Sequence, residues 1–260
     1  MLKTRVITAA IYVPVLLALI FFGGWPLTIG LAFLTAVGLW EYGKMLEAKG
    51  LYVSYPVMMA AGIMLMLFVG NRSWTFLALA VMLILILLVL WAVVVKRSDF
   101  SGIMLQFGGI IYIGLGFGFV LLLRLPASSW WILLLAFLIT WATDVGAYFF
   151  GRALGKRKLA PTISPNKTVA GAVGGVICAI IIAIIYGLLF LDLPLYALLL
   201  LAAAGSVAGQ LGDLWASMIK RWADIKDAGK LFPGHGGVLD RFDSVLFVAP
   251  LVYLLLALLP

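Results

Sequence analysis

The apolar residues of this chain run in continuous stretches of about 20 residues instead of alternating with polar ones, a length that crosses a bilayer as an α-helix. Backbone inside lipid must satisfy its own hydrogen bonds, which favours helices over strands. Glycine, asparagine and proline residues interrupt the stretches, as at Gly23–Gly24, Pro126 and Pro194. The pattern predicts about nine transmembrane helices, at residues 4–22, 27–46, 55–70, 74–95, 102–123, 128–150, 168–189, 193–219 and 244–259.

The composition agrees with this pattern. The mean hydropathy is +1.22 and only 11% of residues are charged, against about 25% in soluble domains. We therefore expect an all-α polytopic membrane protein. The net charge of +8 does not indicate a nucleic-acid partner, because in membrane proteins the location of basic residues carries the information. Cys178 lies in an apolar run and indicates no disulfide. The first stretch reads as a retained helix, since FFGGWP offers no small-x-small cleavage site.

The basic residues also predict an orientation. With the N-terminus in the cytoplasm, all of the 18 Lys and Arg except Arg72 and Arg124 fall on the cytoplasmic side. The C-terminus is then outside, and both long polar loops, 151–167 and 220–243, face the cytoplasm.

Polar chemistry gathers in the second half of the chain. We expect residues 1–125 to be mainly a helical scaffold, with Glu41 and Glu47 in interfacial ion pairs with nearby lysines. Residues 126–260 are the predicted catalytic region of the same membrane unit. Asp144 lies within an apolar span, where an ionisable group is costly and so marks a candidate functional residue. The basic loop after it ends in Ser164, Lys167 and Thr168 around Pro165, which resemble a phosphate-holding turn.

The eighth predicted span carries Gln210, Asp213 and Ser217 at i, i+3 and i+7, on one helix face. Lys220 and Arg221 continue that face into the cytoplasm. Asp213 and Ser217 offer oxygen ligands to a hard cation, and Mg²⁺ takes one or two carboxylates together with water and substrate phosphate. A second carboxylate pair, Asp240 and Asp243, precedes the last span, and the abundance of Lys and Arg favours Mg²⁺ and phosphate over zinc.

Between these pairs lies PGHGG, residues 233–237, which predicts a sharp turn whose backbone N–H groups can approach an anion. For His235 a turn-stabilising or phosphate-contacting role is favoured over proton transfer, because positioning and charge neutralisation dominate phosphoryl chemistry. Gly236, Gly237 and Arg241 are further candidates for substrate binding.

The stretch from Ser217 to Asp243, SMIKRWADIKDAGKLFPGHGGVLDRFD, resembles the signature of the phosphatidate cytidylyltransferases, also called CDP-diacylglycerol synthases. TDVGAYFFGRALGK, PTISPNKT and GQLGD upstream resemble the same family, so the likeness covers most of residues 140–243. One departure is Ala170, where the family commonly has an acidic residue after Lys-Thr-x.

The resemblance implies transfer of CMP from CTP to phosphatidic acid with release of pyrophosphate, in phospholipid biosynthesis at the bacterial inner membrane. It implies a cytoplasm-facing site in which Asp213 and Asp240 hold Mg²⁺ and a second cation such as K⁺. Asp144 or Asp243 would assist, and Ser217 could add a ligand. Phosphates would bind to Lys167, Lys220, Arg221, Lys226 and Arg241. A homodimer is also implied.

Two other classes stay open. A CTP-dependent lipid or polyprenol kinase would use the same nucleotide at the membrane. An ion-coupled transporter would explain acids within spans, although the paired repeats typical of such transporters are not evident. The DGxxAR pattern of the CDP-alcohol phosphotransferases is absent.

Overall fold

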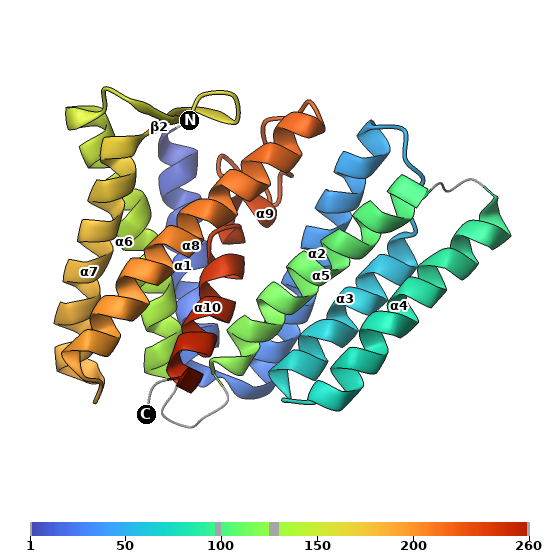
Figure 1. Cartoon of the computed structure of the whole chain (residues 1–260), viewed down its shortest axis with the longest axis horizontal. Helices are drawn as coiled ribbons and strands as arrows, with labels where there is room; N and C mark the ends of the chain where they lie inside the picture. Colours follow the sequence, from blue (N-terminus) through green and yellow to red (C-terminus); the bar gives the residue numbers. More distant parts are fainter. Residues whose placement is uncertain (1, 97–99, 125–129, 259–260) are drawn as a thin grey trace. The chain divides into compact units, whose positions relative to one another are not determined.

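The computed structural model describes residues 2–96, 100–124 and 130–258 (Figure 1). Pro126, Arg97 and the first residues of the predicted 128–150 span lie outside these ranges. The helices are α1 (Leu2–Phe22), α2 (Gly24–Ala48), α3 (Tyr55–Gly70), α4 (Trp74–Val95), α5 (Phe100–Leu122), α6 (Trp130–Leu154), α7 (Val169–Phe190), α8 (Leu195–Trp222), α9 (Leu239–Phe242) and α10 (Val245–Leu258).

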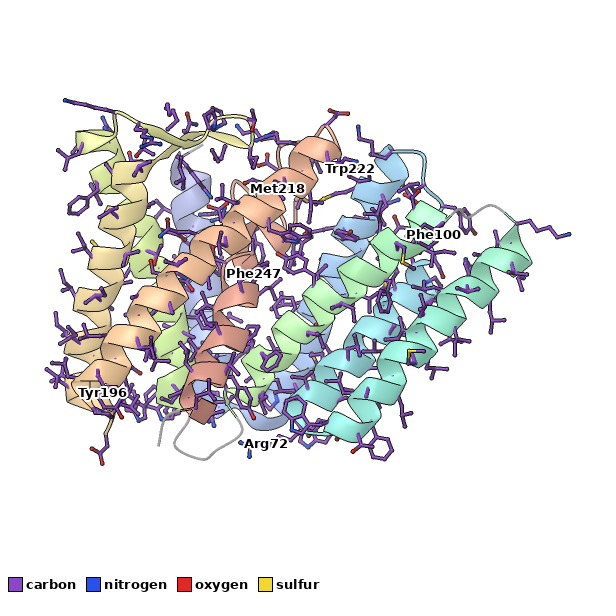
Figure 2. The ribbon with its side chains drawn as sticks, in the orientation of Figure 1. Arg72, Phe100, Tyr196, Met218, Trp222 and Phe247 are labelled. Carbon is purple, nitrogen blue, oxygen red and sulfur yellow. The ribbon has the colours of Figure 1, made fainter. Side chains whose placement is uncertain are left out.

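Each of the nine predicted spans coincides, over its described part, with one of these helices. Among the described residues, α4, α5, α6, α7 and α8 are long and apolar enough to cross a membrane, and three shorter helices are also apolar. The outer surface carries large apolar side chains: Phe100 and Tyr196, labelled in Figure 2, are 77% and 54% exposed. The all-α fold class of a polytopic membrane protein is thus confirmed. The number of crossings and the orientation stay predictions.

The chain forms two compact units. The first comprises Met1–Leu125 and Ile219–Phe242, and the second comprises Pro126–Met218 and Asp243–Pro260. The division falls within α8 and again after α9, so each unit takes part of the segment 217–243.

In the first unit, α3 packs against α2, α4 and α5 (Figure 1). Helices α3 and α5 pack backbone to backbone, because a Cβ on Gly114 would lie 2.9 Å from the carbonyl oxygen of Gly62. Gly118 faces Val69 in the same way. The absence of side chains at these two positions lets α3 and α5 pack closely.

In the second unit, α6 and α7 form the main helix pair (Figure 1), and α10 packs against α6. A Cβ on Gly146 of α6 would lie 2.7 Å from the carbonyl oxygen of Gly174, and one on Gly175 of α7 would lie 2.9 Å from that of Thr143. Because there is no room for side chains at these points, the two backbones pack directly against each other. This contact fixes the position of Asp144 relative to the start of α7.

The interval 151–167 differs from the prediction of a loop. Helix α6 continues to Leu154, and an antiparallel hairpin follows, with β1 (Lys158–Ala160) paired to β2 (Ser164–Thr168). Thr168 lies opposite Lys158, and Ser164 lies opposite Ala160. The expected phosphate-holding turn is thus largely a strand. Pro165 does not prevent this, because proline is tolerated on a strand with an unpaired edge.

Candidate functional site

A cavity of about 210 Å³ lies in the second unit where α6, the hairpin, α7 and α8 meet. Its polar lining includes Asp144 from α6, Lys167 and Thr168 from β2, and Gln210 and Asp213 from α8. Five of the residues singled out in the sequence are thus brought together, although 69 positions separate Asp144 from Asp213 (213 − 144). Ser164 is not among the residues that line the cavity.

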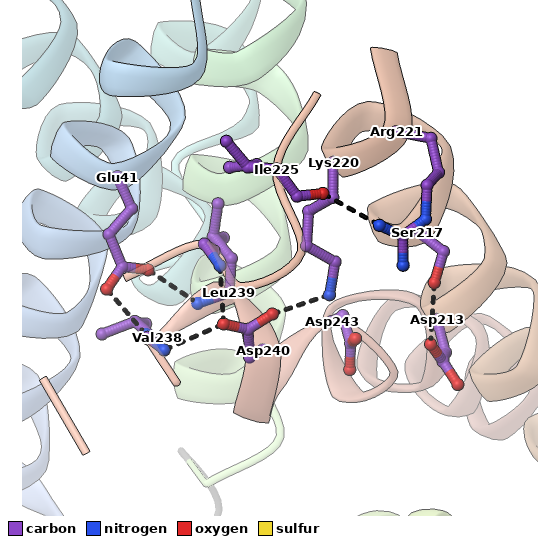
Figure 3. A network of polar contacts seen from close by, with 12 residues as sticks. Glu41, Asp213, Ser217, Lys220, Arg221, Ile225, Val238, Leu239, Asp240 and Asp243 are labelled. Atoms are coloured by element: carbon purple, nitrogen blue, oxygen red, sulfur yellow. Dashed lines mark hydrogen bonds and ion pairs between the residues drawn. The ribbon is translucent and has the colours of Figure 1, made fainter. Parts of the chain in front are cut away.

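Two of the charged groups that line this cavity are already in contact. The Lys167 Nζ lies 2.6 Å from Asp213 Oδ2, and both side chains are partly exposed. The hydroxyl of Ser217 donates a hydrogen bond of 3.4 Å to the other oxygen, Asp213 Oδ1 (Figure 3). Gln210, one turn earlier on α8, donates from Nε2 to the carbonyl of Ala172 on α7. Gln210 therefore faces α7 and Asp213 faces β2, while Ser217 bonds to Asp213 on its own helix.

The N-terminus of α7 forms one wall of the cavity. Thr168 is its N-cap, with Oγ1 accepting a hydrogen bond of 3.1 Å from the backbone N–H of Gly171. The side chain of Thr168 packs against Gly155, where a Cβ would lie 2.7 Å from it. A helix N-terminus carries partial positive charge and attracts anions, and Lys167 adds a full charge next to it. This wall is suited to a phosphate group.

The same cavity can hold a divalent cation. Among its lining residues the carboxylates of Asp144 and Asp213 outnumber the single ammonium of Lys167. Within the described chain, His, Cys, Asp and Glu nowhere gather in threes as a preformed metal centre. Mg²⁺ does not require such a cluster, because it binds through one or two carboxylates and completes its shell with water and phosphate. Asp144 and Asp213 fit that donor set, and a cation at Asp213 would take the place of the Lys167 ammonium.

In the first unit, Asp240 is surrounded by hydrogen-bond donors. Its Oδ1 lies 2.6 Å from the Lys220 Nζ, and its Oδ2 accepts from the backbone N–H groups of Ala228 at 2.7 Å and Gly237 at 2.9 Å (Figure 3). The side chain is only 6% exposed. A cation at Asp240 would bind in place of the Lys220 ammonium, so both predicted cation ligands, Asp213 and Asp240, have a lysine as their counter-ion.

Glu41 supports the same loop from α2. It is 1% exposed, and its two oxygens accept hydrogen bonds of 3.0 Å from the backbone N–H groups of Val238 and Leu239, at the start of α9 (Figure 3). The expectation of an interfacial ion pair is wrong for Glu41, because the nearby lysines pair with other acids. Lys44 contacts Glu47, which confirms that pair, and Lys49 contacts Asp224.

Sequence reasoning therefore missed Glu41 as a residue of this site. The signal was present, because Glu41 is an acid within a predicted span, the same criterion that singled out Asp144. Its partners were not visible, since Val238 lies 197 positions away.

The PGHGG segment turns sharply, as predicted. Gly234 and Gly236 have φ angles of 76° and 91°, which favour glycine, and the N–H of Phe232 bonds to the carbonyl of Gly236 at 2.9 Å. A Cβ on Gly236 would lie 2.4 Å from Asp240 Oδ2. Of the N–H groups that the sequence offered to a substrate anion, that of Gly237 bonds to the carboxylate of Asp240, and that of His235 bonds to the carbonyl of Phe232.

The basic side chains of this loop surround a second cavity, of about 720 Å³, in the first unit. Lys226, Lys230, His235 and Arg241 line it together with Asp227. Arg221 points elsewhere, donating to the carbonyl of Ile225 at 3.0 Å. Of the predicted phosphate ligands, Lys226 and Arg241 thus line a common space.

Asp243 belongs to the second unit and is 8% exposed. Its Oδ1 accepts from the N–H of Ser244 at 2.7 Å, directly before α10. This hydrogen bond orders the start of the last helix.

Comparison with known proteins gives one result along the whole chain. The family model described as "Cytidylyltransferase family" matches residues 3–259. A phosphatidate cytidylyltransferase from Bacillus subtilis (strain 168) is 39% identical, and the match covers 99% of this chain and 98% of the relative. Proteins of the same name from Staphylococcus saprophyticus and Staphylococcus aureus (strain COL) are 38% and 37% identical, each with 98% of this chain and 99% of the relative covered.

Proposed function

The chain belongs to the cytidylyltransferase family, and on that premise we propose that it is a phosphatidate cytidylyltransferase, an integral membrane nucleotidyltransferase. It transfers CMP from CTP to phosphatidic acid, giving CDP-diacylglycerol and pyrophosphate for phospholipid biosynthesis. A phosphate oxygen of the lipid forms a bond to the α-phosphorus of CTP, and the bond from that phosphorus to the β-phosphate bridging oxygen breaks, so that pyrophosphate leaves.

The observation that carries this proposal is the cavity of the second unit. It combines an ammonium, a helix N-terminus and two carboxylates at one place. The ammonium and the helix N-terminus suit phosphate groups, and the two carboxylates suit a divalent cation bound to phosphate. Lys167 and the first turn of α7 bind the phosphates of the nucleotide, while Asp213 and Asp144 hold the cation.

Mg²⁺, when bound, neutralises the phosphates and the charge that develops in the transition state. Asp240 and Ser217 stay predicted ligands, and K⁺ stays a predicted second cation. Lys226 and Arg241 bind the lipid phosphate in the basic cavity of the first unit, and His235 helps to shape that cavity. The roles of Lys220, Arg221 and Asp243 in catalysis are predictions of the same kind.

We also propose the finer topology. Nine crossings place the N-terminus and the polar loops in the cytoplasm and the C-terminus outside, in the bacterial inner membrane. The distribution of Lys and Arg supports this arrangement. The active site then faces the cytoplasmic pool of CTP while the acyl chains stay in lipid. A homodimer remains an expectation from the family resemblance.

The test is an assay of the purified protein with CTP and phosphatidic acid, using CTP labelled in turn on the cytidine and on the γ-phosphate. Cytidylate in the lipid phase supports the proposal. Transfer of the γ-phosphate to lipid identifies a kinase, and transfer of neither label leaves the transporter. The Asp213→Ala variant should lose almost all activity while remaining extractable and folded, and near-normal turnover by it would overturn the assignment of the site.

A further inference from the structure

An apolar groove lies beside the basic cavity of the first unit. It has a volume of about 510 Å³ and is bounded by Ile7, Ile11 and Tyr12 of α1 on one side and by Leu231, Phe232 and Pro233 on the other. This volume falls within the range of about 300–1,000 Å³ found for small-molecule pockets. Ile7 and Ile11 are 50% and 62% exposed, so the groove is open along α1.

The groove and the basic cavity adjoin each other, because Phe232 and Pro233 line both. On one side of these two residues the lining is apolar. On the other side it holds Lys226, Lys230 and Arg241 against the single acid Asp227. Together, the two spaces form an amphiphilic site that complements an anionic head group attached to a hydrocarbon chain.

The two walls of the groove are fixed to each other. The hydroxyl of Thr8 donates a hydrogen bond of 2.9 Å to the carbonyl oxygen of Pro233, and the ring of Tyr12 lies 5.4 Å from Phe232 and 6.1 Å from His235. Thr8 and Pro233 are 225 positions apart in the sequence. The groove is thus a preformed feature of the first unit, and its position relative to the basic loop is set.

We infer that this groove holds one acyl chain of the phosphatidate substrate, with the lipid phosphate in the adjoining basic cavity. The inference rests on the proposed function for the identity of the lipid. Ile7 and Ile11 then contact the methylene groups nearest the glycerol, and Phe232 and Pro233 separate the chain from the phosphate. Helix α1 is accordingly part of the substrate site and not only scaffold.

The first test fills the groove. Ile11→Trp should raise the KM for a long-chain phosphatidate about tenfold, the ratio expected when about two methylene groups lose their burial. The KM for CTP should stay unchanged. Val6→Trp is the control, because Val6 is 60% exposed on the same helix and does not line the groove. Equal KM values for long-chain phosphatidate in the two variants, or an equal rise in the KM for CTP, would overturn the inference.

The second test needs no variant. Phosphatidate with a diazirine in its acyl chain, near the glycerol, is bound to the wild-type protein, irradiated, and the labelled residues are mapped by mass spectrometry. Labels among residues 7–12 and 231–233, reduced by excess unlabelled phosphatidate, support the inference. Labels elsewhere, or labels that the competitor does not reduce, overturn it. Failure of the proposed function would be separate, since wild-type protein would then form no CDP-diacylglycerol whatever the labelling pattern.

Discussion

The carboxylate of Glu41 provides the sharpest test of how the loop before α9 is held. In Glu41→Ala the backbone N–H groups of Val238 and Leu239 lose their acceptors in a place where water does not reach, since Glu41 is 1% exposed. Each buried N–H left without a partner costs about 1–3 kcal/mol, so the ordered loop should lose about 2–6 kcal/mol.

This stability is lost in the segment that carries Asp240. The carboxylate of Asp240 in turn accepts hydrogen bonds from the backbone N–H groups of Ala228 and Gly237, so the whole loop depends on the position of α9. A loss of about 1.4 kcal/mol corresponds to a factor of ten. Cytidylate transfer by Glu41→Ala should therefore fall at least tenfold. Cleavage by a protease in detergent should become faster within residues 224–237. Glu41→Gln keeps one acceptor oxygen. Its cytidylate transfer and its protease resistance should therefore fall between those of Glu41→Ala and those of the wild type.

The control is Glu47→Ala on the same helix, which removes an exposed ion pair with Lys44 and should change stability by less than about 1 kcal/mol. If Glu41→Ala matched Glu47→Ala in both activity and protease sensitivity, the two hydrogen bonds would carry little energy, and the account of the loop would be refuted.

Three further outcomes follow from the second unit. Asp213→Asn should lower kcat by at least about a hundredfold, as removal of one charge-stabilising group commonly does, and measurement at rising Mg²⁺ should not restore it. Lys167→Met should raise the KM for CTP by about 10–100-fold, the equivalent of one charge-assisted hydrogen bond. Extraction of the protein and its melting temperature should not change. A KM within twofold of wild type would argue against phosphate binding by Lys167. Gly146→Val should lower the free energy of unfolding by about 1–3 kcal/mol in a thermal unfolding assay, because it overpacks the α6–α7 contact. The control Gly108→Ala, with nothing within 4 Å of its Cβ, should be neutral or slightly stabilising in the same assay.

The helices could be predicted because their cause is local. A continuous apolar run such as residues 74–95 specifies a helix whatever the rest of the chain does, and α4 has those bounds. The hairpin at 158–168 was not predicted, because its strands are short, polar and defined by their pairing with each other. Local sequence indicated a turn at Ser164–Thr168, and cross-strand hydrogen bonding determined the outcome.

For the candidate site, the residues could be predicted from local sequence and their partners could not. Asp144, Lys167 and Asp213 could be found by residue type and position, because acids within apolar spans and basic loops at their ends are visible in one sequence. The partner of each group could not be found. Glu41 was assigned to lysines a few positions away, and its carboxylate instead binds backbone 197 positions distant. Such pairings depend on the tertiary fold, which spacing along the chain does not encode.

The contact between Lys167 and Asp213 has a consequence for the order of events in the cavity. While the ammonium lies 2.6 Å from the carboxylate, each neutralises the other, and neither charge is fully available to a ligand. A cation that binds Asp213 releases the ammonium, which is then free to bind an anion. A phosphate that binds Lys167 likewise exposes the carboxylate. If Asp213 holds a cation as proposed, cation and phosphate would promote each other's binding by counter-ion exchange, and a metal–nucleotide complex would satisfy both partners in one step.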